Sequence, residues 1–207
     1  MSNIDPEIKV ILLGEAGVGK TNLINISTGG EFSYGTMSSS SCTYQEGKYE
    51  SGNGKTYEYH LWDTAGQEAY RSLSKIFIQN SKVVICVYSI DNQKSFDELD
   101  YWVNLVKSEL GDKGYVMGIV ANKNDLYEDQ VVKEEDGKKY AKAKGIKFKT
   151  TSALTEPTGF KGFLDELIVD YIKTIDPTCK DEVKSNVFKL QGGKKKEKNK
   201  PKQRGFC

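Results

Sequence analysis

The sequence predicts an α/β fold: a six-stranded, mostly parallel sheet with one antiparallel strand and helices on both faces. Short, continuous apolar runs alternate along the chain with segments whose apolar residues recur at helical spacing. Such runs are typical of parallel strands that are buried on both faces. The 207 residues are enough for one domain with a sizeable core. We therefore expect a folded domain over residues 1–175 and a flexible basic tail over residues 176–207.

The strands are predicted from their apolar patterns. Ile8–Leu13, Val83–Tyr88 and Val116–Ala121 are continuous apolar runs that predict buried strands, and Ile146–Thr150 predicts a shorter one. Tyr57–Asp63 instead alternates between apolar and polar residues. A Gly-Lys pair just before it predicts a hairpin, and therefore an antiparallel strand upstream.

Helical spacing or a polar, helix-forming composition predicts four helices, over Lys20–Ser27, Ser95–Leu110, Glu134–Lys144 and Phe160–Ile175. Between the first helix and the hairpin, residues 29–43 are rich in Gly and Ser, which predicts a long mobile loop.

The charge is unevenly distributed. The net charge is +1, but residues 194–204 carry +6, which leaves −5 for the rest of the chain. A mildly acidic body argues against nucleic-acid binding, and a basic tail suits an anionic surface. The four cysteines match no zinc-binding spacing, and Cys42, Cys86 and Cys179 are expected to be free thiols in a reducing compartment. No apolar run reaches the ~18 residues that a membrane-spanning helix needs.

Residues 14–21, GEAGVGKT, are a complete match to G-x-x-x-x-G-K-[ST] between a predicted strand and a predicted helix. The glycines let the backbone wrap around phosphates, so that N–H groups and the helix N-terminus point at negative charge. Lys20 would reach the β- and γ-phosphates, and the Thr21 hydroxyl would ligate Mg²⁺. The expected phosphate-binding residues are Gly14, Glu15, Ala16, Gly17, Val18, Gly19, Lys20 and Thr21. The motif predicts a nucleoside triphosphate and leaves the base open.

The base is predicted from NKND at residues 122–125, which ends the third buried strand. Asp125 can accept hydrogen bonds from N1–H and the N2 amino group of guanine. Asn122 can contact its O6/N7 side and tie this loop to the phosphate loop, and the stem of Lys123 can cover the base. Ser152 and Ala153, in the TSA that follows the next short strand, are further candidates, with the Ala153 N–H placed to bind O6.

Residues 62–68, WDTAGQE, follow the alternating strand. Asp63 is placed to hold Mg²⁺ through water. The backbone N–H of Gly66 can sense the γ-phosphate, and Gln67 can orient the attacking water.

These elements, in this order and spacing, resemble the Ras superfamily of small GTPases over residues 7–175. The chain is most similar to the Rab branch, because Trp62 precedes DTAGQE within KTYEYHLWDTAGQEAYRSL and a basic, hypervariable tail ends in cysteine. The resemblance implies the P-loop small-GTPase fold, and that Phe32 stacks on the other face of guanine. Metabolic kinases and ATPases with the same phosphate loop are disfavoured by NKND and DTAGQE.

The resemblance also implies a function. We expect a GTP-binding, GTP-hydrolysing switch that uses Mg²⁺, is slow without an activating protein, and regulates vesicle traffic. Its partners would be an exchange factor, a GTPase-activating protein and effectors on the switch regions. It would act at the cytoplasmic face of an intracellular membrane and cycle with the cytosol. Tyr44, Trp62 and Phe77 would form an aromatic surface for partners, unless they serve only ordinary packing.

The Ser-rich loop after the first helix corresponds to the first switch loop of the family, and it departs from the family pattern. The family has a Thr followed by Ile-Gly-Val-Asp-Phe, and this chain has SSSSCTYQEG. Counting back from Trp62 points to Ser40 as the Mg²⁺ ligand, and counting forward from Lys20 points to Ser39. This departure keeps a second function open: a nucleotide-binding scaffold with negligible hydrolysis.

The tail departs as well. The family commonly ends in two cysteines or Cys-x-Cys, and this chain ends in Gly-Phe-Cys, which is not a C-a-a-X box either. We expect prenylation of Cys207, with the +6 segment as the second signal that a single lipid needs for stable membrane binding. The alternative is an unmodified terminal thiol.

Overall fold

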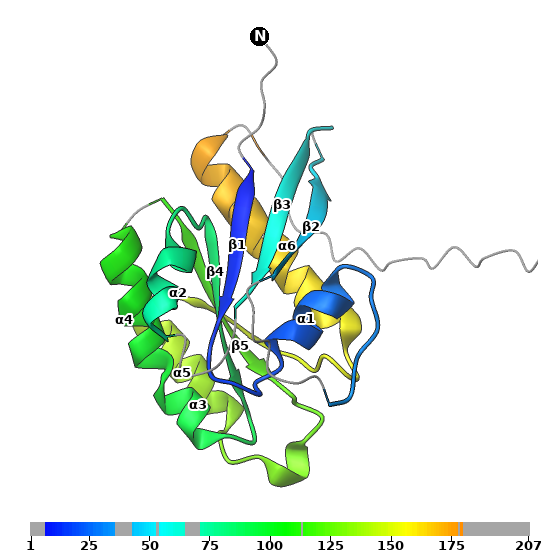
Figure 1. Cartoon of the computed structure of the whole chain (residues 1–207), viewed down its shortest axis with the longest axis vertical. Coiled ribbons are helices and arrows are strands. Elements are labelled where there is room, and N and C mark those ends of the chain that lie inside the picture. Colours follow the sequence, from blue (N-terminus) through cyan, green and yellow to red (C-terminus); the bar gives the residue numbers. More distant parts are fainter. Residues whose placement is uncertain are drawn as a thin grey trace, which may run out of the picture.

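In the computed structural model, which describes residues 7–35, 43–52, 54–64, 71–112, 114–177 and 179, six strands form one sheet in the order β2-β3-β1-β4-β5-β6 (Figure 1). Only β2 runs antiparallel to its neighbour; the other pairs are parallel. The predicted fold class is therefore confirmed. The strands are β1 Ile8–Leu13, β2 Thr43–Glu50, β3 Thr56–Asp63, β4 Val83–Ser89, β5 Val116–Asn122 and β6 Lys147–Thr150.

The helices within the described residues are α1 Lys20–Ser27, α2 Arg71–Ile78, α3 Gln93–Asp97, α4 Leu99–Leu110, α5 Glu134–Lys144 and α6 Pro157–Ile175, with a 3₁₀ turn at Tyr127–Asp129. The single helix expected over Ser95–Leu110 is wrong, because it is two helices that meet at Glu98. The first begins before the apolar spacing does, since the side chain of Asn92 caps it by accepting the Ser95 N–H at 3.0 Å.

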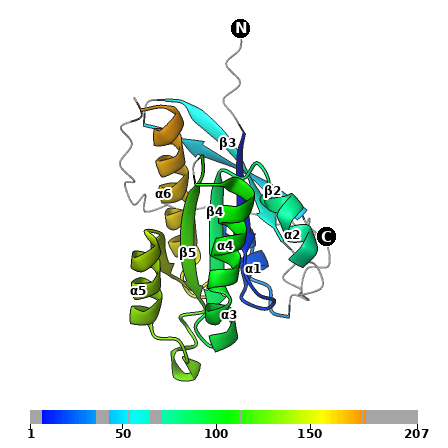
Figure 2. The same cartoon turned by 90° about the vertical axis from the view of Figure 1, so that its left-hand side faces the viewer.

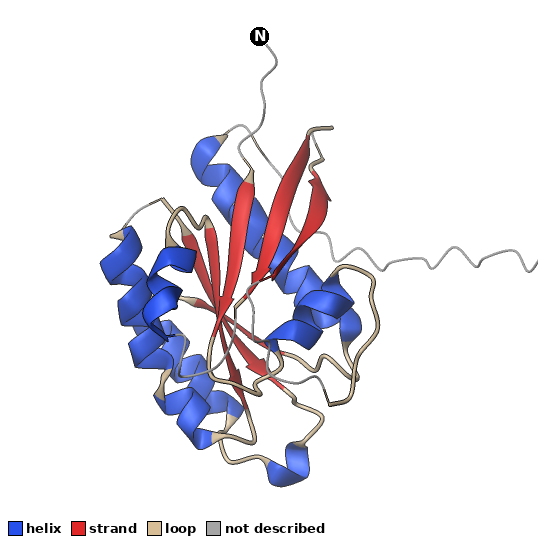
Figure 3. Ribbon diagram, in the orientation of Figure 1, coloured by secondary structure: helices blue, strands red, loops and turns tan. Residues whose placement is uncertain are grey.

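The helices cover the sheet as two layers, with the red strands of Figure 3 between them. On one face, α1 and α6 pack on alternate residues of the strands, such as Val10 and Leu12 of β1. On the other face, the intervening residues Ile11 and Leu13 belong to a second core with α3, α4 and α5, the face that is turned to the viewer in Figure 2. β1 is thus buried on both sides, as its continuous apolar run predicts.

The parallel pairing brings the carboxyl ends of five strands, β3, β1, β4, β5 and β6, to one edge of the sheet. Leu12 of β1 lies beside Asp63 of β3, and Ser89 of β4 lies beside Asn122 of β5. The segments GEAGVGKT, NKND and TSA lie at or just beyond the ends of β1, β5 and β6 at this edge, and Asp63 and Thr64 of WDTAGQE lie at the end of β3. In open α/β sheets, ligands bind outside the carboxyl ends of the strands.

The described chain continues past α6 and is fastened to the β2–β3 turn. Lys55 forms an ion pair with Asp176 at 2.8 Å, and the buried Cys179 thiol lies 3.6 Å from the Ser51 hydroxyl. Among the described residues, no helix combines the length and the hydropathy that a membrane span requires.

Two glycines test the packing of α6 on the sheet. A Cβ on Gly118 of β5 would lie 2.6 Å from Leu167 Cδ1 and 2.9 Å from Phe163 Cε1, whereas a Cβ on Gly162 of α6 would meet nothing within 4 Å. We expect Gly118→Ala to lower the free energy of unfolding by about 1–3 kcal/mol through overpacking. Gly162→Ala should raise it by about 0.5–1 kcal/mol, because Ala suits a helix interior better than Gly. Urea unfolding of both variants measures this, and equal effects would contradict the packing described.

Candidate nucleotide-binding site

The phosphate loop, residues 14–19, connects β1 to α1 and fits tightly between its neighbours. Gly14 has φ of +146° and Gly19 has φ of +94°. A Cβ on Gly14 would collide with the carbonyl oxygen of Val87 in β4, and a Cβ on Gly19 would collide with the amide of Asn122. Ala16 and Gly17 instead lie exposed at the top of the loop, and a Cβ on Gly17 would meet nothing within 4 Å. The two ends of the loop are therefore packed against β4 and β5, and its tip is exposed.

Lys20, the first residue of α1, is 5% exposed. Its ammonium donates to the backbone carbonyl oxygens of Gly14 at 2.8 Å and Glu15 at 2.9 Å, so it spans the phosphate loop. Burial lowers the pKa of Lys20 to about 8, and the carboxylates of Asp63 and Glu15 oppose this shift. A buried ammonium without full charge compensation favours an anionic ligand, because the ligand supplies the missing counter-charge.

Thr21 and Asp63 bring two oxygen ligands together beside Lys20. The Thr21 hydroxyl donates to Asp63 Oδ2 at 2.7 Å, and Asp63 is almost completely buried. The next residue is also fixed, since the Thr64 hydroxyl donates to the Leu12 carbonyl oxygen at 2.6 Å. A hydroxyl and a carboxylate are the kind of ligands that Mg²⁺ prefers, so these residues fit the ion. When bound, Mg²⁺ would neutralise charge on the β- and γ-phosphate oxygens.

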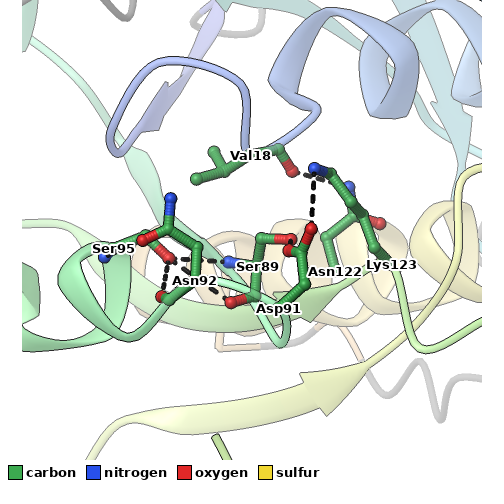
Figure 4. Close-up of polar contacts among 7 residues, drawn as sticks. All are labelled: Val18, Ser89, Asp91, Asn92, Ser95, Asn122 and Lys123. Carbon is green, nitrogen blue, oxygen red and sulfur yellow. Dashed lines mark hydrogen bonds and ion pairs between the residues drawn. The ribbon is translucent and has the colours of Figure 1, made fainter. Parts of the chain in front are cut away.

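Asn122 connects the phosphate loop to the loop after β6. Its Nδ2 donates to the Val18 carbonyl oxygen at 2.8 Å, and its Oδ1 accepts the Ala153 N–H at 3.2 Å. Figure 4 shows the contact with Val18. The tie expected from NKND is therefore present in the structure. The Ala153 N–H, expected to bind guanine O6, is engaged by Asn122 here.

Asp125 is oriented by Ser152. The Ser152 hydroxyl donates to the Asp125 carboxylate and accepts the N–H groups of Leu154 and Thr155, both at 3.0 Å. The two loops are joined a second time where the Asn124 N–H donates to the Thr151 carbonyl oxygen at 3.2 Å. Asp125 is half-buried, and its carboxylate is therefore presented in one fixed direction.

A polar cluster after β4 supports Lys123, and no motif pointed to it. Lys123 has φ of +63°, and its ammonium lies 3.6 Å from Asp91 Oδ2. The Ser89 hydroxyl donates to Asp91, and the Ser95 hydroxyl donates to the Asn92 carbonyl oxygen at 2.7 Å (Figure 4). The one signal in the sequence was position, since this segment follows a buried strand.

The aromatic candidates contact other apolar side chains. Phe32 is half-buried and meets the ring of Tyr34 edge-on, with centroids 4.9 Å apart. Tyr44 stacks on Trp62 with centroids 5.2 Å apart, and Phe77 is half-buried in α2. Five of the predicted site residues lie outside the described residues: Gly66, Gln67, Ser39, Ser40 and Cys207.

Comparison with known proteins shows the family of the chain. A family model described as the Ras family matches residues 9–173. The chain is 36% identical over 151 residues to the Ras-related protein Rab-26 of Mus musculus, covering 73% of this chain and 58% of that protein. It is 34% identical over 151 residues to Rab-5B of Plasmodium falciparum, covering 73% and 72%. It is 37% identical over 157 residues to Rab-21 of Geodia cydonium, covering 76% and 68%. The chain belongs to the Ras family and is Rab-like.

The depressed pKa of Lys20 predicts that nucleotide binding takes up a proton. The negative charge of the bound phosphates raises the pKa of Lys20 again. The affinity for nucleotide is therefore highest below pH 8 and decreases as the pH rises above about 8. At pH 8 we expect uptake of about half a proton per GDP, because Lys20 is then about half protonated in the free protein and fully protonated in the complex. Calorimetry in buffers of different ionisation enthalpy measures the uptake. No uptake at pH 8 would contradict the assignment.

Proposed function

We propose that the chain is a GTP-binding and GTP-hydrolysing switch. The observation that carries this proposal is the convergence at one sheet edge of the Lys20 ammonium, the Thr21–Asp63 pair and the Asn122–Ala153 tie. The Lys20 ammonium would bind phosphate oxygens, and the Thr21–Asp63 pair would bind Mg²⁺. The Asn122–Ala153 hydrogen bond joins the two loops that would bind guanine. Membership of the Ras family supports the same activity.

The residues would act by position and charge. Water attacks the γ-phosphorus, the bond to the β–γ bridging oxygen breaks, and GDP and phosphate leave. Lys20 stabilises the charge that develops on the phosphate oxygens. Gln67 would orient the water, and Gly66 would donate its N–H to the γ-phosphate. The reaction requires little covalent chemistry from the protein, so turnover is slow until an activating protein supplies a further positive group, worth roughly 10³–10⁵ in rate.

Single-turnover hydrolysis tests this assignment. We expect wild-type protein to convert bound GTP to GDP slowly, and Gln67→Leu to be on the order of ten- to a hundredfold slower, because the water loses its orientation. Gln79→Leu is the matched control: Gln79 is exposed just after α2, and its loss should leave the rate unchanged.

Two results would argue for another function. Wild-type turnover no faster than that of Gln67→Leu would favour the nucleotide-binding scaffold with negligible hydrolysis. Displacement of bound GDP by ATP as readily as by GTP would overturn the guanine assignment.

We further propose a Rab-like role in vesicle traffic, with an exchange factor, a GTPase-activating protein and effectors that bind the switch regions. Similarity to proteins named Rab supports this role. Tyr44 and Trp62 offer an aromatic surface at the end of the SSSSCTYQEG stretch. Tyr44 is 50% exposed, and the Lys9 ammonium lies 4.8 Å from the centroid of the Trp62 ring. This surface suits a partner that reads the nucleotide state.

Prenylated Cys207 and the basic segment 194–204 would attach the chain to the cytoplasmic face of an intracellular membrane. The protein would cycle between this membrane and the cytosol. A single lipid binds marginally, and each basic residue adds about 1 kcal/mol near an anionic surface. Cys207→Ser should release the protein from membranes. Replacing the six lysines of this segment with glutamine should redistribute the protein while the lipid stays attached. Fractionation with intact-mass measurement tests both, and a native protein without added prenyl mass contradicts the proposal.

A further inference from the structure

The side chain of Asn22, in the first turn of α1, contacts the backbone of Ser33 through both of its polar atoms. Nδ2 donates to the Ser33 carbonyl oxygen at 3.1 Å, and Oδ1 accepts the Ser33 N–H at 3.1 Å. Asn22 is 7% exposed, whereas Ser33 is exposed. A buried amide is unfavourable unless it is hydrogen-bonded. The two bonds therefore hold residue 33 firmly against the helix.

Aromatic residues flank Ser33 on both sides. Phe32 packs against the core between the sheet and helices α1 and α6, and Tyr34 meets the Phe32 ring edge-on at an interplanar angle of 75°. Because a residue's backbone sets where its neighbours' side chains begin, fixing Ser33 fixes the Phe32 ring. Phe32 is the residue expected to stack on guanine.

We propose that Asn22 is a positioning residue for the nucleotide site: it holds Ser33 so that Phe32 stays where it can stack on the base, and it thereby slows nucleotide release. The inference rests on the proposed function. In this arrangement the Asn22 side chain acts only through the Ser33 backbone, while its neighbour Thr21 serves the metal.

The same helix provides a matched control. Asn25, one turn further along α1, accepts a hydrogen bond from Gln45 Nε2 at 2.8 Å, and the Thr28 hydroxyl donates to the same glutamine. Asn25 is thus the same residue type on the same helix, but its bond leads to β2 rather than to the segment that contains Phe32.

The experiment measures release of fluorescent mant-GDP from the full chain after a chase with excess GDP. Losing two hydrogen bonds at a buried amide should make release from Asn22→Ala roughly tenfold faster. Asn25→Ala should stay within about twofold of wild type, because a lost bond to β2 leaves Phe32 in place. In a Phe32→Ala background, Asn22→Ala should add less than about twofold, because the ring that it positions is absent.

A conservative variant separates positioning from loss of structure. Asn22→Gln keeps a neutral amide with the same donor and acceptor but displaces both by one methylene, so its release rate should fall between those of wild type and Asn22→Ala. If Asn22→Ala does not yield folded protein, Asn22→Gln carries the test alone and in the Phe32→Ala background.

Two results would overturn the inference. One is release from the Asn22 variants at the wild-type rate. The other is an acceleration that is fully retained in the Phe32→Ala background, which would mean that Asn22 acts by another route. A wild-type chain that does not bind mant-GDP is a different result, seen before any variant is made. It overturns the proposed function, and the inference falls with it.

Discussion

The buried amide of Asn122 is the contact on which the candidate site depends. It is 1% exposed and lies at the end of β5, where one side chain joins the phosphate loop to the loop after β6. Both of its polar atoms are used, and a partner lost in such a place leaves an unsatisfied group at a cost of about 1–3 kcal/mol. The tie also explains Gly19, because any Cβ there would occupy the position of the amide. Parallel strands alone bring the loops to one edge; Asn122 sets their spacing.

Lys20 is held in one position by the phosphate loop. Backbone carbonyl oxygens of the loop hold its ammonium at 2.8–2.9 Å, and the desolvation that lowers its pKa has already taken place in the fold. In the proposed function, an incoming phosphate would meet an ammonium whose position is already fixed, which is a form of preorganisation. Asp63 serves two needs, because it opposes the pKa shift of Lys20 and accepts the Thr21 hydroxyl.

Much of this architecture could be predicted from sequence, and particular residues show why. β1, α1 and α5 begin and end at the predicted residues, and a glycine stands directly beside one limit of each: Gly14 after β1, Gly19 before α1 and Gly145 after α5. The break between α3 and α4 was missed because apolar spacing continues through Glu98, and the cap formed by Asn92 has no apolar signal. In the site, motif residues are brought together as expected, and their roles stay predictions. Asp91 and Asn22 were not found, since single polar residues that act through tertiary contacts form no sequence pattern.

The strand pair β2–β3 is the one antiparallel part of the sheet. It lies on the lateral side of the sheet, where β2 has a neighbouring strand on one side only. It is fastened at both ends by polar contacts. Gln45 is held on α1 by Asn25 and Thr28, and at the far turn Lys55 pairs with Asp176 beyond α6. Since α1 also begins at the phosphate loop and holds Ser33, one helix contacts the phosphates' loop, the segment bearing Phe32 and the edge strands. A helix of only eight residues therefore joins the phosphate loop to β2, the strand that carries Tyr44.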